Sequence, residues 1–171
     1  MKILVVSDIH GREDILRRAA MTHSDRDGLL FLGDGVRDID MEALRCGGRF
    51  FAGVRGNCDP VYLSAQNYSF DDELILNICE YTVIMMHGHL HGVKQGIDRA
   101  VAYAAERGAD ILLFGHTHLS LERYYAEGAE VGGVILQKPI WVMNPGSLGG
   151  GSYGLLQIKN KNILISHGAI K

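Results

Sequence analysis

The sequence predicts an α/β protein built from two stacked β-sheets with helices on their outer faces. In the first third of the chain, short β-branched runs alternate with segments of helical periodicity, which is typical of parallel strands between covering helices. Near the middle, two adjoining apolar runs have the pattern of an antiparallel hairpin. Beyond Gly115 the apolar runs have the pattern of strands, and so many strands with so few helices favour a second sheet.

The first third is expected to fold in the order strand, helix, strand, helix, strand. Apolar residues such as Ile15, Leu16 and Ala19 recur at helical spacing in the first helix. The expected strands are residues 2–7, 28–32 and 49–54, and the expected helices are residues 13–22 and 40–46.

The remainder is expected to contain a hairpin, one helix and several further strands. The runs ELILNI and YTVIMM are separated only by a short CE link, which is the signature of a hairpin. Ile97, Val101 and Ala104 form one apolar stripe in a helix at residues 93–107. The other expected strands are residues 110–114, 119–126, 130–137, 140–143, 153–159 and 162–166.

Length and composition favour one domain spanning residues 1–171. A chain of 171 residues with 47% hydrophobic and 22% charged residues can bury a substantial core, and it contains no internal repeat or linker-like tract. The formal net charge of −3 argues against an extended basic surface for nucleic acid, although it permits a small phosphate-bearing substrate.

The cysteines and the apolar runs favour a cytoplasmic protein without a membrane segment. Cys46, Cys58 and Cys79 are an odd number without CxxC spacing, so neither a disulfide framework nor a thiolate zinc site is expected. The opening MKILVVSDIH has too few apolar residues for a signal peptide. The long uncharged run at 139–158 contains too many glycines and polar residues for a membrane helix.

Polar residues that could bind a ligand follow five of the apolar runs. Because ligands bind at the carboxyl ends of strands in open α/β sheets, we expect these side chains to converge on one edge. In an extended chain, residues two positions apart point to the same side, so Asp8 and His10 can face one point, and so can His116 and His118. The residues are Asp8, His10, Asp34, Asn57, His87, His116 and His118.

These seven residues offer oxygen and nitrogen ligands without a thiolate. Such a set suits Mn²⁺, our first choice, or Ni²⁺, Zn²⁺, Fe or Co²⁺ better than Ca²⁺ or Mg²⁺. Seven ligands are too many for one ion and fit two divalent transition-metal ions about 3.5–4 Å apart, provided that one carboxylate bridges them. Asp34 stands alone at its strand end and is the expected bridge.

The motifs DIHG, GDGVRD, GNCD, HGH and GHTH, in this order, resemble those of the calcineurin-like metallophosphoesterases. In length and in GNCD the chain looks like the compact YfcE-like phosphodiesterases of that family, and the NPGS segment at 144–147 is a further shared feature. The resemblance implies a four-layer α/β/β/α sandwich of two mixed sheets flanked by helices. It assigns Asp8, His10, Asp34 and His118 to the first metal ion, and Asp34, Asn57, His87 and His116 to the second.

The resemblance also implies hydrolysis of a phosphodiester by a hydroxide that bridges both ions, with Asn57 among the catalytic residues. Many members have a histidine after this asparagine, whereas this chain has Cys58. His89, with Asp59 behind it, is the expected proton donor in its place. Without a histidine acid, good leaving groups should be favoured.

Several assignments stay open at this point. Arg12, Arg37 and Arg55 flank the motif loops and could clamp a substrate phosphate, but solvated surface arginines are the commoner outcome. The NPGS segment is either a flexible loop or closes one side of the site. His23 and His167 are expected to be ordinary surface or core histidines.

Two other classes of function fit the same residues. One is a catalytically silent scaffold or binding module, because a eukaryotic retromer subunit has a similar fold and acts by binding partners. The other is a phosphomonoesterase or nucleotide pyrophosphatase, which sequence does not separate from a phosphodiesterase. The expected partner is a small phosphodiester or nucleotide-like substrate, without an extended nucleic-acid surface and without a membrane, and a homo-oligomer is left open.

Overall fold

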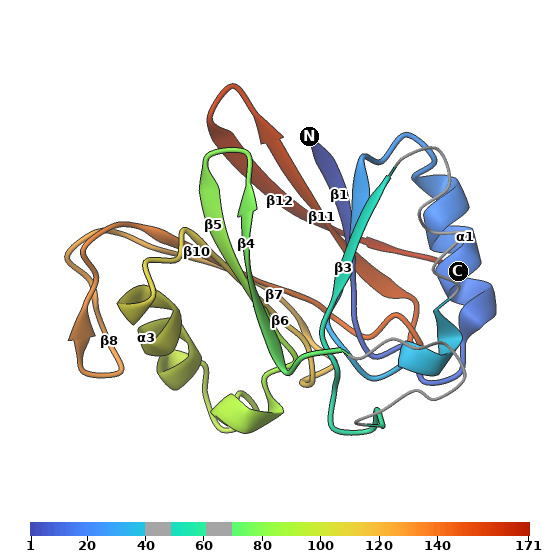
Figure 1. Cartoon of the computed structure of the whole chain (residues 1–171), viewed down its shortest axis with the longest axis horizontal. Helices are drawn as coiled ribbons and strands as arrows, with labels where there is room; N and C mark the ends of the chain where they lie inside the picture. Colours follow the sequence, from blue (N-terminus) through green and yellow to red (C-terminus); the bar gives the residue numbers. More distant parts are fainter. Residues whose placement is uncertain (40–48, 61–69) are drawn as a thin grey trace.

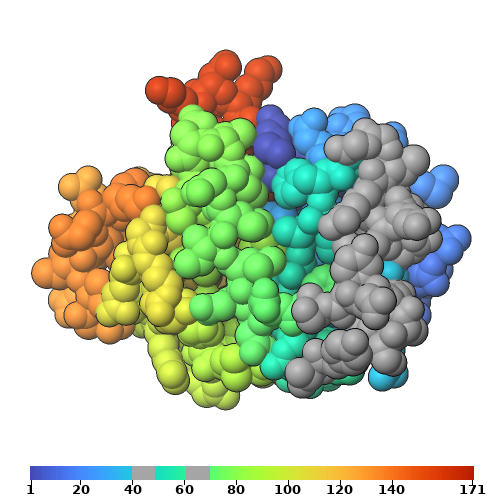
Figure 2. Space-filling view, in the orientation of Figure 1, coloured from blue at the N-terminus to red at the C-terminus, as the bar shows by residue number. Residues whose placement is uncertain are grey.

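In the part of the chain that the structure describes, two β-sheets pack face to face and a helix covers the outer face of each (Figure 1). The computed structural model describes residues 1–39, 49–60 and 70–171, which are the coloured residues in Figure 2. Helix α1 (Glu13–Thr22) packs on the first sheet, and helix α3 (Asp98–Glu106) packs on the second. The layers therefore follow the predicted α/β/β/α order.

The first sheet has the order β12-β11-β1-β2-β3 over the described residues. β1, β2 and β3 are parallel, and the hairpin β11-β12 joins β1 in antiparallel direction. All three parallel strands therefore end at the same edge of the sheet. The bounds are β1 (Lys2–Val6), β2 (Gly28–Phe31), β3 (Phe50–Gly53), β11 (Ser152–Lys159) and β12 (Asn162–Ala169).

The second sheet has the order β4-β5-β6-β10-β7 over the described residues. β5, β6 and β10 are parallel, and β4 and β7 flank them in antiparallel direction. The predicted ELILNI–YTVIMM hairpin is β4-β5. The bounds are β4 (Glu73–Ile78), β5 (Tyr81–Met86), β6 (Ile111–Phe114), β7 (Ser120–Tyr125) and β10 (Ile140–Pro145).

Buried apolar side chains fill all three spaces between the four layers. Along β1, Ile3 and Val5 face the space between the sheets, whereas Leu4 and Val6 face α1. The same alternation separates the two faces of β6. Because successive strand residues point to opposite faces, a short run that is apolar throughout can be buried on both sides. Each such side chain contributes roughly 1.5–3 kcal/mol by leaving water.

The structure corrects the predicted helix at residues 93–107, which is shorter. It begins at Asp98, because Gly96 has a φ of 149° and lies outside the helical region. The short 3₁₀ turn η2 (His89–His91) precedes it. The predicted helix at residues 40–46 lies outside the described residues.

The structure also corrects the predicted strand at residues 130–137. It is a two-stranded ribbon, β8 (Glu130–Val131) and β9 (Val134–Ile135), which turns at Gly132 and Gly133 with φ of 57° and 81°. The predicted strand at 140–143 is longer than expected and continues as β10 to Pro145. None of the helices in the described ranges is both long enough and apolar enough to span a membrane.

Candidate metal centre

The carboxyl ends of the parallel strands of both sheets meet at one edge of the molecule. The 3₁₀ turns η1 (Val36–Asp38) and η2 lie at this edge, at the bottom of Figure 1. The N–H of Asp8 donates to the Gly33 carbonyl at 2.8 Å within the first sheet, and the N–H of Gly115 donates to the His87 carbonyl at 3.1 Å within the second. The N–H of His116, after β6, donates to Oδ2 of Asp8, after β1, at 3.1 Å, so loops of the two sheets meet there. This edge is where the sequence places its candidate ligands.

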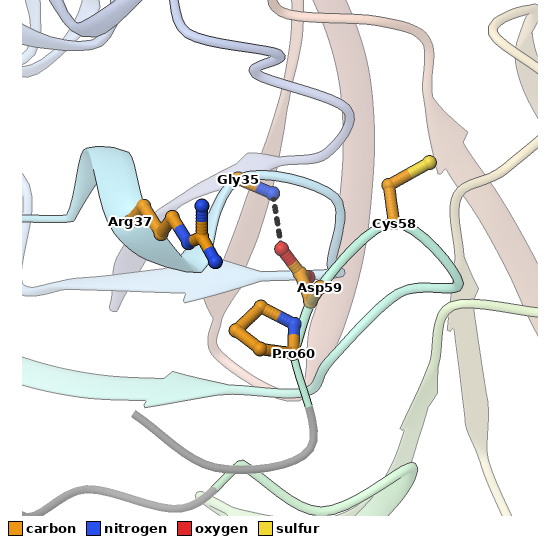
Figure 3. Close-up of a pocket in the computed structure, with 5 residues that line it drawn as sticks. All are labelled: Gly35, Arg37, Cys58, Asp59 and Pro60. Carbon is orange, nitrogen blue, oxygen red and sulfur yellow. Dashed lines mark hydrogen bonds between the residues drawn. The ribbon is translucent and has the colours of Figure 1, made fainter. Parts of the chain in front are cut away.

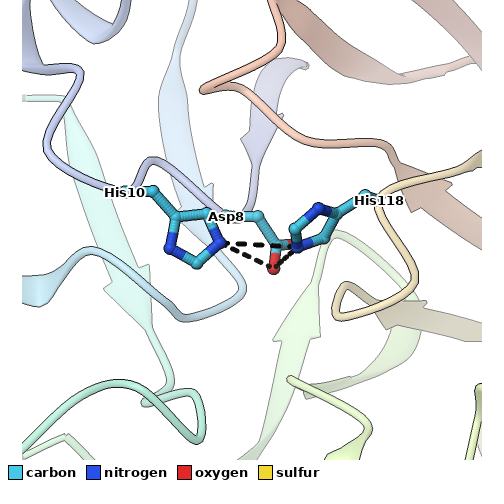
Figure 4. Close-up of side chains that lie close together, drawn as sticks. All are labelled: Asp8, His10 and His118. Atoms are coloured by element: carbon cyan, nitrogen blue, oxygen red, sulfur yellow. Dashed lines mark hydrogen bonds and ion pairs between the residues drawn. The ribbon is translucent and has the colours of Figure 1, made fainter.

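Asp8, His10 and His118 form the first group of candidate ligands (Figure 4). Oδ1 of Asp8 lies 3.1 Å from His118 Nε2 and 3.8 Å from His10 Nε2. The two imidazole Nε2 atoms lie 3.4 Å apart. The carboxylate is fully buried, whereas both imidazoles are exposed on their outer side. Three donor atoms therefore face one point at the surface.

Asp34, His87 and His116 continue this group inward. His87 Nε2 lies 3.4 Å from Asp34 Oδ2 and 3.2 Å from His116 Nδ1. His87 Nδ1 lies 2.7 Å from the Leu32 carbonyl, and a proton on Nδ1 leaves Nε2 as the free lone pair. His10 Nε2 lies 4.0 Å from Asp34 Oδ2 and links the two groups. Six of the seven predicted ligands thus form one continuous run of donor atoms, with Asp34 near its middle.

Asn57, the seventh predicted ligand, lies at the rim of the same site. It is exposed, and its amide nitrogen lies 3.2 Å from Cys58 Sγ. The next backbone N–H, that of Cys58, donates to Asp34 Oδ1 at 2.8 Å. The loop that carries Asn57 is therefore joined directly to the central carboxylate.

Five of the candidate ligands have left-handed backbone conformations. Such conformations are unfavourable for residues with a Cβ, although Asp and His tolerate them better than most, and they often occur at functional sites. Hydrogen bonds between the loops hold them, including one from Ile9 N to the Asp34 carbonyl at 2.8 Å. The φ angles are 55° at Asp8, 50° at His10, 60° at Asp34, 67° at His116 and 62° at His118.

Two glycines allow the ligand loops to approach one another. A Cβ on Gly56 would overlap Oδ1 of Asp34, and a Cβ on Gly115 would overlap Oγ of Ser7. Each glycine stands next to a candidate ligand in the sequence. Their role in the site is therefore close packing of backbone against side chain.

The electrostatics of the site keep its central carboxylate ionised. Burial alone would raise the pKa of Asp34, but the interaction with His87 and the N–H of Cys58 outweigh it and hold the pKa well below its usual range. Burial alone would lower the pKa of His87, but Asp34 and Asp8 raise it. Burial, together with the neighbouring His87, lowers the pKa of His116 to about 4. An anionic carboxylate next to neutral imidazole is a suitable donor set for a divalent cation.

Two further observations indicate that these residues are suited to a metal centre. Oδ1 of Asp8 is fully buried and accepts no hydrogen bond, although His118 Nε2 lies nearby. A buried charged oxygen without a donor is costly unless a cation approaches it. In each of the groups Asp8–His10–His118 and Asp8–Asp34–His87, one donor atom from every residue lies within 4.8 Å of those of the other two.

His89, the predicted proton donor, lies beside the inner group. Its ring centroid is 5.5 Å from that of His87 and 6.1 Å from that of His116. Its Nδ1 is buried and has no hydrogen-bond partner among the described residues. Burial lowers the pKa of His89, and His87 lowers it further.

Asp59 has a different position from the one predicted, because it does not support His89. Its two carboxylate oxygens accept four backbone N–H groups, at 2.7 Å from Asp34, 2.8 Å from Gly35, 3.0 Å from Val36 and 2.8 Å from Gly56. These bonds hold the loop after β2 against the loop after β3. Asp59 is therefore a positioning residue for the Asp34 loop.

Sequence reasoning underestimated the NPGS segment. Asn144 is fully buried at the end of β10, and its amide donates to the Gly115 carbonyl at 2.8 Å and to Thr117 Oγ1 at 3.0 Å. Ser147 Oγ donates to the Asp8 carbonyl at 3.0 Å. The segment thus anchors the first and last ligand loops. Its position after an apolar strand, like the other motifs, is the signal that could have indicated this role.

Three motif-flanking arginines and two other histidines complete the comparison with the sequence. Arg12 pairs with Asp14 at 3.0 Å, and Arg55 pairs with Asp72 at 2.7 Å, so the guanidinium of each is already paired with a carboxylate. Arg37 lies on η1. Nε2 of His167 lies 2.8 Å from the Asn144 carbonyl, and the ring of His23 packs edge-on against Tyr153.

Residues 1–161 match the family model of the calcineurin-like phosphoesterase superfamily domain. The chain is also similar to YsnB of Bacillus subtilis (strain 168), a probable metallophosphoesterase. The two share 33% identity over 162 residues, which cover 94% of this chain and 86% of that protein.

Two solved structures resemble this one closely in fold. A novel archaeal phosphodiesterase superposes with a TM-score of 0.68 at 21% identity, over 98% of this chain and 99% of its own. Wild-type Vps29 of Entamoeba histolytica, in complex with Zn²⁺, superposes with a TM-score of 0.68 at 21% identity, over 99% of each chain. At these identities the likeness establishes the shared fold.

Proposed function

Because this chain belongs to the calcineurin-like phosphoesterase superfamily, we propose that it is a phosphodiesterase that works with two divalent metal ions. The observation that carries the proposal is the continuous run of donor atoms from His118 through Asp8, His10, Asp34 and His87 to His116. Its length exceeds what one ion needs, and a carboxylate lies near its middle.

The chain would hold the two ions with the ligands that the motifs assign. Asp34 would serve both, with Mn²⁺ as the first choice and Ni²⁺, Zn²⁺, Fe or Co²⁺ as alternatives. Ions bound there would supply a water of lowered pKa and would neutralise charge on the phosphoryl oxygens. The first set is Asp8, His10, Asp34 and His118, and the second is Asp34, Asn57, His87 and His116.

The remaining chemistry falls to the residues around the ligands. His89 stands beside His87 and His116, so its imidazole could deliver a proton to the departing oxygen. Asp59, Asn144 and Ser147 hold the ligand loops in place through backbone hydrogen bonds. Fixed ligand loops keep the phosphate in one orientation during displacement.

A diester with a good leaving group is the favoured substrate. Cys58 stands where many relatives have a histidine, and burial together with Asp34 raises the pKa of its thiol, so it is a weak acid at neutral pH. The resemblance in fold to an archaeal phosphodiesterase supports the same choice. Cleavage of a phosphomonoester or nucleotide pyrophosphate is the nearest alternative.

A binding scaffold is the second candidate function, and the similarity to Vps29 favours it. This candidate makes no use of the unpartnered Asp8 oxygen or of the facing imidazoles. Its expected signature is a folded protein with no turnover and a stable protein partner. A homo-oligomeric state and a cytoplasmic location also remain predictions.

Elemental analysis and a hydrolysis assay on the same preparation test the proposal. The protein is assayed with bis(nitrophenyl) phosphate and with nitrophenyl phosphate, before and after chelation and with Mn²⁺, Ni²⁺ or Zn²⁺ restored. Two metal ions per chain and metal-dependent cleavage that prefers the diester are expected. Absence of both bound metal and turnover under all these conditions would favour the scaffold.

A further inference from the structure

A cavity of about 330 Å³ opens beside the candidate metal centre. Its described lining residues are Gly35, Arg37, Cys58, Asp59 and Pro60 (Figure 3). Arg37 projects from η1 on one side and Cys58 stands on the other, with Asp59 and Pro60 between them. The cavity is large enough for a small polar group and several carbon atoms beyond it.

Cys58 joins this cavity to the metal centre. Its Sγ is grouped with donor atoms of His10 and Asp34, all within 4.8 Å of one another. Its backbone N–H donates to Asp34 at 2.8 Å. A phosphoryl group held by metal ions beside Asp34 would therefore lie next to the mouth of the cavity.

The Arg37 backbone is held in a fixed position relative to the ligand loops. The residue before it, Val36, is buried and donates its N–H to Asp59 at 3.0 Å. The residue after it, Asp38, accepts the N–H of Gly11 at 2.8 Å through Oδ2. A side chain on a turn that is anchored at both neighbours loses less freedom when it binds a ligand.

Arg37 carries an exposed charge that no other described residue neutralises. Neither an ion pair nor a hydrogen bond of its guanidinium is present in the ranges 1–39, 49–60 and 70–171, whereas Arg12 and Arg55 each pair with an aspartate. The carboxylate of Asp59 in the cavity wall already accepts four backbone N–H groups. Its charge is therefore partly balanced by those donors, and the guanidinium is free to bind an anion.

We propose that this cavity is a subsite for a second anionic group of the substrate, bound by Arg37 while the metal centre holds the first phosphate. The inference rests on the proposed function, and it narrows the substrate class to phosphoesters that carry a further phosphate or carboxylate. A guanidinium binds either oxyanion through two parallel N–H donors. Among the five described lining residues, Arg37 supplies the positive charge that would recognise the anion.

Binding of matched phosphonates to the metal-loaded protein tests the subsite. The probes are a plain alkylphosphonate, the same chain ending in a carboxylate, and the same chain ending in a second phosphonate. Their affinities are measured by calorimetry for the wild type and for Arg37→Ala, Arg37→Lys and Arg12→Ala. Arg12→Ala is the matched control, because Arg12 also flanks a motif but is paired with Asp14.

The wild type should bind at least one of the two probes with a second anionic group about tenfold more tightly than the plain alkylphosphonate. Arg37→Ala should remove this preference, Arg37→Lys should keep part of it, and Arg12→Ala should keep all of it. Preference for both charged probes assigns the subsite to oxyanions in general, and preference for the bisphosphonate alone assigns it to a second phosphate. Equal affinities in the wild type, or a preference that survives Arg37→Ala, would overturn the inference.

The hydrolysis assay on bis(nitrophenyl) phosphate separates this inference from the proposed function. Turnover without an Arg37-dependent preference would leave the phosphodiesterase standing and remove the subsite. An Arg37-dependent preference without turnover would keep the anion subsite and remove the phosphodiesterase.

Discussion

The carboxylate of Asp59 lies against the backbone of Asp34 and accepts its N–H at 2.7 Å. The same carboxylate accepts the N–H of Gly56 at 2.8 Å, so one side chain ties together the loops that end β2 and β3. Asp34 is the carboxylate near the middle of the donor run. The geometry of the candidate metal centre therefore depends on Asp59, whose side chain holds the backbone of the ligand loops.

Substitution of Asp59 by asparagine should destabilise the protein and weaken metal binding together. An amide nitrogen would face backbone N–H donors in place of an oxygen, and the lost bonds should cost about 2–3 kcal/mol in the free energy of unfolding. Denaturant unfolding and metal titration measure the two effects. Asp71→Asn is the control, because Asp71 is exposed and its side chain makes no described contact. Equal unfolding free energies for Asp59→Asn and wild type would contradict the positioning role.

Asp34→Asn should abolish hydrolysis and reduce metal content below two ions per chain. The substitution removes the charge that would serve both ions, while the side chain keeps its size. Hydrolysis of bis(nitrophenyl) phosphate and elemental analysis are the measurements. Asp25→Asn is the matched control, because Asp25 is exposed and pairs with Lys2 at 2.7 Å, away from the ligand loops. Full activity with two metal ions bound would refute the bridging assignment.

His89→Ala should slow poor leaving groups more than good ones. A proton donor matters most when the departing oxygen is strongly basic, so an alkyl ester should lose about 10²–10⁴-fold in kcat and a nitrophenyl ester much less. A series of aryl and alkyl diesters gives the leaving-group dependence. His167→Ala is a control of the same type, because the described hydrogen bond of its side chain is to the Asn144 carbonyl and involves none of the candidate ligands. An equal loss across the series would remove His89 as the proton donor.

Asn144→Ala should cost about 2–3 kcal/mol in the free energy of unfolding, because it leaves the Gly146 N–H and Thr117 Oγ1 without the Asn144 amide and removes one of the two donors to the Gly115 carbonyl. Looser anchoring of the loop that carries His116 and His118 should also reduce hydrolysis. Denaturant unfolding and the diester assay measure these effects. Asn162→Ala should change neither, since Asn162 is exposed and bonds only within the β11-β12 turn. A loss of less than about 0.5 kcal/mol would show that Asn144 is not an anchor.

His23 should make the protein less stable as the pH falls through the range near 6.5. Burial, with a contribution from Lys2, lowers the pKa of His23 below its ordinary value of 6.5, and its Nε2 has no described hydrogen-bond partner. The unfolded chain therefore takes up this proton first, so stability is present above that pH and is lost below it.

Comparison with His23→Phe tests this pH effect. Phenylalanine keeps an aromatic ring against Tyr153 but cannot be protonated. Between about pH 7.5 and about pH 5.5, the variant should lose less unfolding free energy than the wild type. Parallel losses in the two proteins would show that other groups cause the acid sensitivity.

Local pattern was sufficient for much of the fold and for the choice of candidate ligands. Short, continuous apolar runs predicted β1, β2 and β6, and α1 begins and ends at the predicted residues. These patterns can be read from residues close together in the sequence, because side chains repeat every 2 residues along a strand face and every 3.6 residues along a helix face. Polar residues directly after such runs must lie at the ends of strands, so Asp8, Asp34 and His87 could be chosen without a structure.

The tertiary structure alone decided what the residues around the ligands do. Asp59 was expected behind His89, yet its carboxylate holds a loop that begins 25 residues earlier in the chain. Asn144 was expected in a loop, yet it is buried and anchors residues 29 positions away. The partners of Asp59 and Asn144 include backbone N–H and carbonyl groups, which occur all along the chain. The sequence therefore does not indicate which of these groups a given side chain will contact. The sequence by itself determined the candidate metal ligands, and the packing of the two sheets decided which residues hold their loops in place.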